Sequence, residues 1–180
     1  MECRIVLEFH DLLYIINLLS MKKSGGVILL PLPKKYFLTA ATSEGKSELT
    51  AFDGALLKAR VGNTNLIRVS SILPPGCEYE PDLVIPPGSL LPIAYGYIVS
   101  ANPGEKIAAA VGVGIKKNSF GVIMEFEGTC SKEEAEEKVT AMVEEAFEMR
   151  EIELDEIKVA SCEHVVQEIG CAFAAVPLWY

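Results

Sequence analysis

Residues 65–76 read Asn-Leu-Ile-Arg-Val-Ser-Ser-Ile-Leu-Pro-Pro-Gly, an apolar run that ends in two adjacent serines and a proline-glycine turn. The apolar run predicts a strand over 64–70, because aliphatic and β-branched residues fit a pleated, half-buried surface. The Pro-Pro-Gly that follows cannot continue regular structure, so we expect the Ser70–Ser71 peptide at a rigid strand end that can hold backbone strain. By itself, such a serine pair is most simply a strand end that enters a turn.

Composition bounds the class of protein. The chain has 180 residues, and half of them are apolar, which is enough to bury the core of one domain. A formal net charge of −9 argues against a nucleic-acid partner, whose phosphates the chain would repel. The five cysteines are odd in number and contain no C-x-x-C pair. They predict reduced thiols in the cytoplasm, and they indicate neither a disulfide framework nor a zinc site.

The N-terminal segment contains an apolar run at residues 12–19 that is too short to span a bilayer. Three acidic residues precede this run, whereas a secretory signal has a basic start and a small-residue cleavage site. We therefore expect no membrane segment, an amphipathic helix within an N-terminal extension over residues 1–34, and a single domain over 35–180. The alternative is that translation begins at Met21 and that the preceding residues are a gene-calling artefact.

Two segments have the signature of helices. Residues 50–53 (Thr-Ala-Phe-Asp) have the spacing of a capping box, and the apolar residues that follow at helical spacing predict a helix over 50–60. Residues 131–134 (Ser-Lys-Glu-Glu) repeat this signature. A single apolar stripe after them predicts a long helix over 131–150.

Strand-like runs account for most of the remaining chain and occupy residues 36–42, 93–100, 107–115, 120–127, 156–166 and 171–178. Turn signals at residues 102–104 and 116–119 predict that the three middle runs form an antiparallel meander. The proline-rich passage over 74–92 predicts an ordered loop or edge structure. The Val-Gly-Val-Gly at 111–114 does not predict a phosphate loop, because another strand follows it instead of a helix. Two helices among mostly antiparallel strands predict an α+β layered sandwich.

Few side chains offer catalytic chemistry. Of the two histidines, His10 lies in the N-terminal extension, and His164 is expected to be a structural histidine because no nucleophile elbow accompanies it. Asp53 is expected in the first turn of its helix, where a carboxylate also complements the helix dipole. Glu125 and Glu127 share one face of their strand, which is either a wetted surface or part of a site.

Five longer motifs follow one another along the chain: residues 51–57 (AFDGALL), 62–75 (GNTNLIRVSSILPP), 94–98 (AYGYI), 124–128 (MEFEG) and 170–175 (GCAFAA). Together they closely resemble the archaeal pyruvoyl-dependent arginine decarboxylases, in order and in spacing. The resemblance runs from about Tyr36 to the last residue. For that part it implies a four-layer αββα sandwich with mostly antiparallel sheets.

The resemblance also implies a chemistry for the serine pair. Members of this family are proenzymes that cut themselves between two serines, which implies cleavage of this chain into residues 1–70 and 71–180. The Ser71 hydroxyl would attack the Ser70 carbonyl, and β-elimination would then release Ser70 as a new C-terminus. The residue left at position 71 would become a covalent pyruvoyl group. That group serves as the electron sink in place of pyridoxal phosphate, and no metal is implied.

Three further site residues follow from the same resemblance. Glu125 is implied as the general acid that protonates the product, a role that needs a raised pKa. Asn65 matches the position implicated in processing, and Asp53 matches the position that contacts the guanidinium of L-arginine. The family also implies a homotrimer with active sites between neighbouring subunits. Its product agmatine points to polyamine synthesis.

Two alternatives remain open from the sequence. In the first alternative, the chain is a pyruvoyl decarboxylase for another amino acid such as histidine or ornithine. This alternative stays open because only Asp53 bears on the substrate side chain. In the other alternative it is a non-catalytic oligomeric binding protein whose serine pair is only a turn.

Overall fold

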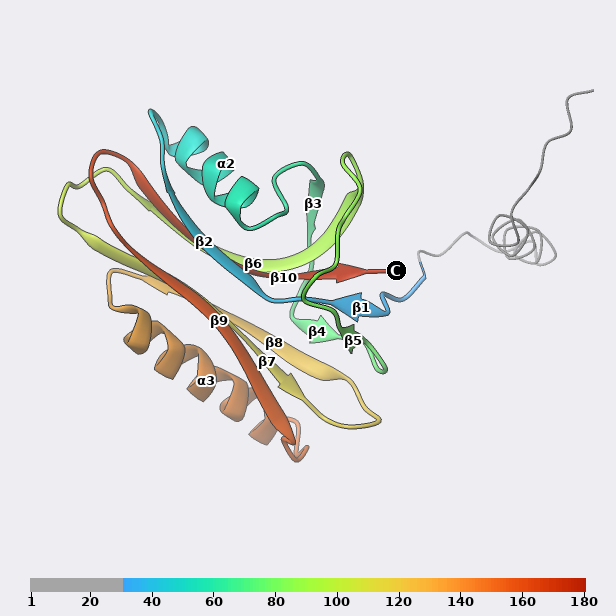
Figure 1. The fold of residues 1–180 in the computed structure, drawn as a ribbon. Coiled ribbons are helices and arrows are strands. Elements are labelled where there is room, and N and C mark those ends of the chain that lie inside the picture. Colours follow the sequence, from blue (N-terminus) through green and yellow to red (C-terminus); the bar gives the residue numbers. More distant parts are fainter. Residues whose placement is uncertain (1–30) are drawn as a thin grey trace, which may run out of the picture. The chain divides into compact units, whose positions relative to one another are not determined.

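The computed structural model describes residues 31–180, which contain two helices and ten strands (Figure 1). The expected N-terminal helix lies outside the described residues. In chain order the elements are β1 (Lys35–Tyr36), β2 (Thr39–Glu44), α2 (Glu48–Lys58), β3 (Asn65–Arg68), β4 (Ile72–Leu73), β5 (Glu78–Tyr79), β6 (Leu90–Ser100), β7 (Lys106–Ile115), β8 (Gly121–Gly128), α3 (Lys132–Glu148), β9 (Glu156–Val165) and β10 (Gly170–Trp179).

The strands form two sheets that pack face to face between the two helices (Figure 1). One sheet has the order β3-β6-β10-β1-β5, with β2 also paired to β10, and the other has the order β4-β8-β7-β9. Only β1–β5 and β3–β6 pair in parallel among the described strands. The layers are therefore α2, six-stranded sheet, four-stranded sheet and α3. This arrangement confirms the expected αββα sandwich.

Apolar side chains fill the space between each pair of layers. Ile107, Val111 and Ile123 belong to the cluster between the sheets, and separate clusters lie under α2 and under α3. Gly114 of β7 faces α3, where a Cβ would lie 2.4 Å from the Phe147 ring. The glycines of this strand thus give α3 room to approach the sheet, a role in packing and not in phosphate binding.

The capping box of α2 lies one turn earlier than the sequence predicted. Ser47 is the N-cap, its hydroxyl accepts from the Thr50 N–H at 3.3 Å, and the Thr50 hydroxyl accepts from the Ser47 N–H at 3.0 Å. The predicted box that begins at Thr50 is wrong, because Ser47 makes the same reciprocal pair three residues before it. Asp53 consequently lies in the second turn of α2. The predicted box of α3, from Ser131 to Glu134, is confirmed.

The predicted three-stranded meander is only partly correct. β7 and β8 form an antiparallel pair, but β6 pairs with β10 and β3 in the other sheet. The connection at residues 102–104 therefore crosses between sheets instead of closing a hairpin. Gly104 has a φ of +85° in this turn. A tight turn with a glycine of positive φ can close a hairpin or connect two sheets. The turn signal could not reveal which partner each strand takes.

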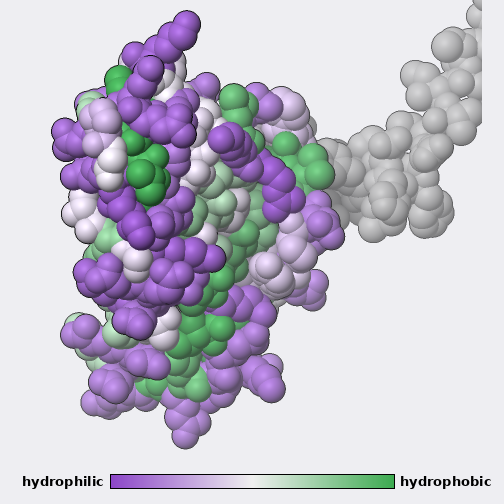
Figure 2. All heavy atoms as spheres, turned by 60° about the vertical axis from the view of Figure 1, so that its left-hand side comes forward, coloured by the Kyte–Doolittle hydropathy of each residue, from purple (hydrophilic) through white to green (hydrophobic). Residues whose placement is uncertain are grey.

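The face of the molecule that Figure 2 shows carries both hydrophilic and hydrophobic surface. An island of hydrophobic residues stands among hydrophilic ones in the upper part of the face that Figure 2 shows. Leu49 on α2 is 75% exposed and Tyr97 on β6 is 42% exposed. They line a pocket of about 280 Å³ together with Glu48, Phe52 and Val99. Within residues 31–180, no helix is long and apolar enough to cross a membrane.

Candidate active site

Ser70 and Ser71 cross the gap between the two sheets. β3, which precedes them, pairs with β6 of the six-stranded sheet, and β4, which follows them, pairs with β8 of the four-stranded sheet. The Val69 N–H donates to the Ile93 carbonyl at 3.1 Å, and the Ile123 N–H donates to the Ser71 carbonyl at 2.8 Å. A main-chain hydrogen bond to the six-stranded sheet thus holds the chain before the Ser70–Ser71 peptide, and one to the four-stranded sheet holds the chain after it.

The crossing is a three-residue turn centred on Ser71. The Ile72 N–H donates to the Ser70 carbonyl oxygen at 2.8 Å, which is the hydrogen bond of a γ-turn. Among residues 31–180, the non-glycine residues with positive φ are Arg60, Asn118 and Glu151. The serines are not among them, so the strain expected at this peptide does not take the form of a left-handed backbone.

Glu125 is the side-chain partner of Ser71. The Ser71 hydroxyl donates to Oε2 of Glu125 at 3.4 Å. Glu125 lies on the same face of β8 as Ile123, which packs in the cluster between the sheets. This face is buried between the sheets at Ile123, partly buried at Glu125 and exposed at Glu127, so the wetted-surface interpretation holds only for its Glu127 end. Burial raises the pKa of Glu125, and the nearby charge of Arg68 and the Ser71 hydrogen bond only partly oppose this effect.

A second carboxyl group, that of Glu127, and a glycine, Gly96, lie beside Glu125. Glu127 lies two residues beyond Glu125 on the same face of β8, opposite Gly96 of β6. A Cβ on Gly96 would lie 2.5 Å from Oε2 of Glu127 and 3.3 Å from Cβ of Glu125, so the glycine makes room for both side chains. The guanidinium of Arg68 donates to the Tyr95 carbonyl at 3.0 Å. Burial raises the pKa of Glu127, and the charge of Arg68 opposes it.

The sequence indicates no role for Gly96 or Arg68, and it indicates Glu127 only as a residue on the same strand face as Glu125. All three lie inside the motifs that carry the resemblance, at AYGYI, MEFEG and the stretch before the serine pair. A glycine in the middle of a strand was the available signal, since it often marks a close approach by another group.

Asp53 and Asn65 do not join Ser71 and Glu125 within one chain. Asp53 is exposed on α2, which covers the outer face of the six-stranded sheet, whereas Glu125 lies on the inner side. Asn65 begins β3, six residues before Ser71, a separation of roughly 20 Å in an extended strand. Its side-chain amide donates to the Gly88 carbonyl at 2.8 Å. The structure therefore brings Ser71 and Glu125 together, whereas Asp53 and Asn65 lie away from them in the same chain.

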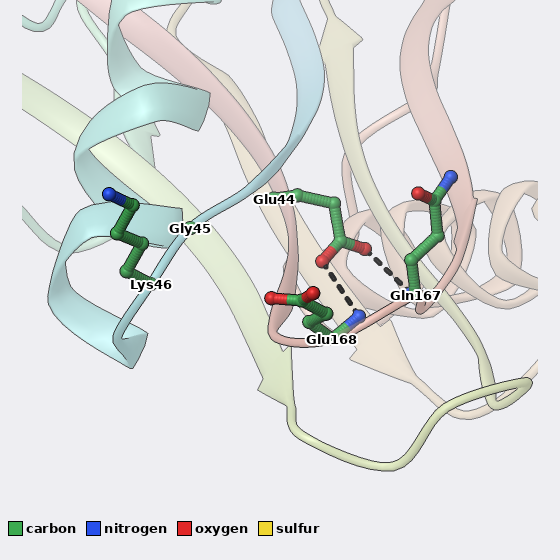
Figure 3. Close-up of a pocket in the computed structure, with 5 residues that line it drawn as sticks. All are labelled: Glu44, Gly45, Lys46, Gln167 and Glu168. Atoms are coloured by element: carbon green, nitrogen blue, oxygen red, sulfur yellow. Dashed lines mark hydrogen bonds between the residues drawn. The ribbon is translucent and has the colours of Figure 1, made fainter.

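His164 has a different partner, at the other end of the sandwich. Its Nε2 makes a hydrogen bond with Glu44 of β2, whose carboxylate also accepts from the main-chain N–H of Ile169. The same carboxylate accepts from the main-chain N–H groups of Gln167 and Glu168 (Figure 3). These donors, with that of Gln167 first, lower the pKa of Glu44 to about 2. The pair links β2 of one sheet to β9 of the other. His164 is therefore a structural histidine, as expected, and Glu44 is a partner that the sequence did not reveal.

The fold and this site define an αββα sandwich protein with a serine and a protonatable carboxyl group where the chain crosses between its sheets. The sequence model of pyruvoyl-dependent arginine decarboxylase matches residues 35–180, so the chain belongs to that family. The chain is 54% identical over 151 residues to the pyruvoyl-dependent arginine decarboxylase of Methanocaldococcus jannaschii, which covers 83% of this chain and 92% of that relative. It is 49% identical over 150 residues to the one of Thermococcus kodakarensis, with coverage of 82% and 96%. The family resemblance noted in the sequence is confirmed.

Proposed function

We propose that this chain decarboxylates L-arginine to agmatine and CO2 with a covalent pyruvoyl group made from Ser71. The observation that carries the proposal is the hydrogen bond from the Ser71 hydroxyl to Glu125 at the crossing between the sheets, in a chain of this family. The pyruvoyl group supplies the electron sink for the loss of CO2. Position 71 fits such a group, because the Ile123 N–H anchors its carbonyl beside Glu125.

Self-cleavage between Ser70 and Ser71 would precede turnover. The two products, residues 1–70 and 71–180, would stay together after the cut. β2 and β3 of the first product pair with β10 and β6 of the second, and the anchors on both sides of the peptide do not depend on the bond that breaks. The matured protein is therefore a stable complex of two chains that only denaturant separates.

Glu125 acts as the general acid in this proposal. Loss of CO2 leaves a carbanion that must take up a proton, and a carboxyl group delivers one only if it is protonated when the reaction begins. The burial that raises the pKa of Glu125 favours the protonated form. The ketone carbon at position 71 would lie next to this proton, because Ser71 and Glu125 already touch.

Asp53 binds the guanidinium of the substrate through a paired carboxylate, and Asn65 assists the processing step. Neither reaches Ser71 of its own chain, so these roles require residues of a neighbouring subunit. The exposed Leu49 and Tyr97 beside α2 offer apolar surface for such a contact. We therefore propose a homotrimer with active sites between subunits. We place it in the cytoplasm, where agmatine would enter polyamine synthesis.

Mass spectrometry of the purified protein tests the proposal directly. We expect two chains, with the second beginning at position 71 and carrying a blocked N-terminus that borohydride reduces. Ser71→Ala should stay whole, folded and inactive, because it lacks the attacking hydroxyl. Ser70→Ala is the matched control, since Ser70 contributes only its carbonyl, and it should still be cut. Fully matured protein with the mass of an intact chain would overturn the proposal.

Substrate choice needs a separate assay. Arginine, lysine, ornithine and histidine should be compared at equal concentration with the matured enzyme. Arginine should be the best substrate, because its planar guanidinium can form two parallel hydrogen bonds with Asp53 and an ammonium group cannot. Preference for another amino acid would retain the pyruvoyl chemistry and overturn the assignment to arginine.

A further inference from the structure

The Ser70 carbonyl oxygen already has a hydrogen-bond donor in the uncut chain. The Ile72 N–H lies 2.8 Å from it, in the γ-turn centred on Ser71. This is the one hydrogen bond to that oxygen in the described part of the chain. The Asn65 amide, the side chain that the family resemblance connects with processing, bonds to Gly88 at the far end of β3. Within a chain, the donor at the reacting carbonyl is therefore main-chain and not Asn65.

We propose that the main-chain N–H of Ile72 stabilises the oxyanion that forms on Ser70 during self-cleavage. The inference rests on the proposed self-cleavage and adds the group that promotes its first step. Negative charge develops on the Ser70 oxygen when the Ser71 hydroxyl adds to the carbonyl carbon. A donor that is in place before the reaction stabilises this charge without reorganisation, as in other oxyanion sites.

The step itself balances within the chain. A bond forms between Oγ of Ser71 and the carbonyl carbon of Ser70, and the amide bond between that carbon and the Ser71 nitrogen breaks. The hydroxyl proton ends on the Ser71 nitrogen, which becomes a free amine, and the electron pair on the oxyanion restores the carbonyl. The product is an ester of the same composition. The Ile72 N–H donates its hydrogen bond to the Ser70 oxygen throughout and is itself unchanged by the step.

The turn brings the nucleophile and the donor to the same carbonyl. Ser71 supplies the hydroxyl and Ile72, the next residue, supplies the N–H, so one three-residue turn positions both. The Ile123 N–H holds the Ser71 carbonyl from β8, and the Val69 N–H is held by Ile93 of β6. Because opposite sheets hold the two sides, the turn cannot relax into a continuous strand. The crossing between the sheets thereby preorganises the step.

Replacement of single N–H groups by oxygen tests the inference. The α-hydroxy acid analogue of isoleucine, inserted at position 72 by in vitro translation with a suppressor tRNA, keeps the side chain and removes the donor. We expect the full-length chain, refolded and followed by mass spectrometry, to be cut about 100-fold to 1,000-fold more slowly, the usual loss for one oxyanion donor. Mass separates a cut after Ser70 from hydrolysis of the new ester after Ser71.

Position 169 offers a matched control, because it is also an isoleucine whose N–H donates a hydrogen bond, at 3.0 Å to the Glu44 carboxylate at the other end of the sandwich. The same analogue there should leave the rate within several-fold of wild type. Normal cutting with the analogue at 72, or equal slowing at both positions, would overturn the inference alone. A wild-type chain that is never cut would instead overturn the proposed self-cleavage, and this inference with it.

Conventional variants provide a second measurement. Ile72→Pro also lacks the N–H, whereas Ile72→Val keeps it with a side chain of the same kind. We expect Ile72→Pro to remain uncut and Ile72→Val to be processed normally, with circular dichroism and gel filtration to confirm that both fold. Cleavage of folded Ile72→Pro at the wild-type rate would overturn the inference.

Discussion

Glu125 and Glu44 occupy opposite ends of the sandwich and have opposite pKa shifts. Glu44 accepts three main-chain N–H groups and the His164 ring, which lower its pKa to about 2. Glu125 accepts one hydroxyl at 3.4 Å, and burial raises its pKa. The number of donors and the degree of burial therefore decide whether a glutamate between two sheets is an ionised structural link or an acid that can hold a proton.

The distance between the two ends follows from strand register. On β7, Val111 lies opposite Glu125 of β8, and Ile107 lies opposite His164 of β9. Four residues of extended strand separate these positions, or roughly 13 Å along the strand. A change at one end should therefore leave the other end intact, which lets each glutamate serve as the control for the other.

The largest effect is expected from Glu125→Gln. Glutamine keeps the shape but cannot deliver a proton, so kcat should fall by about 100-fold to 10,000-fold, the usual contribution of a general acid. Release of CO2 from labelled arginine measures the loss, and mass spectrometry should show that the variant is still cut. Glu44→Gln should retain a kcat near that of wild type. A wild-type kcat for Glu125→Gln would remove the acid role.

Glu44→Gln should instead lower stability. The variant loses the charge that Gln167, Glu168, Ile169 and His164 solvate, at a cost of roughly 1–3 kcal/mol in the free energy of unfolding at pH 7. A pKa lowered in the folded state stabilises above the ordinary value of 4.5, and this stabilisation is lost as the pH falls toward about 2. Denaturant unfolding at several pH values should show the two proteins converging in acid.

The exposed Glu137 on α3 provides the control for that measurement, because it makes no hydrogen bond of this kind. Glu137→Gln should change the free energy of unfolding by less than about 0.5 kcal/mol at every pH. Equal stability of Glu44→Gln and Glu137→Gln at neutral pH would contradict the structural role of Glu44.

The smallest effect is expected at the charges around Glu125. The negative charge of Glu127 raises the pKa of Glu125, and the positive charge of Arg68 lowers it. Activity that needs protonated Glu125 falls as the pH rises through this pKa. Glu127→Gln should therefore move the fall to lower pH, and Arg68→Met should move it to higher pH, each by less than about one unit. Profiles of kcat against pH that shift in the same direction would contradict the assignment.

Local sequence signals predicted the regular elements well. The capping box at Ser131 and the turn at residues 116–119 involve groups a few residues apart, and the structure confirms the helix and the hairpin that they predicted. Errors arose where two local solutions competed or where the partner was distant. Ser47 and Thr50 both offered a plausible N-cap, and the turn at 102–104 suited a hairpin as well as a crossing between sheets.

The candidate site likewise contains residues that short motifs identified and one that depends on a distant neighbour. Ser71 and Glu125 were identified from the motifs, and the structure brings them together. Gly96 was not identified, because its importance comes from Glu127 on the opposite sheet, 31 positions away in the chain. No short-range pattern reports such a neighbour.

The sequence by itself determined the family, the two helices, most strands, the serine pair and Glu125 as a candidate partner for it, because periodicity, caps and motifs act over a few residues. Only the tertiary structure decided that the serine pair joins two different sheets and that the Ile72 N–H bonds to the Ser70 carbonyl. It also decided that Asp53 and Asn65 lie away from Ser71 in their own chain. Strand partners and facing side chains are chosen by long-range pairing and burial, which leave no mark on the residues next to them in sequence.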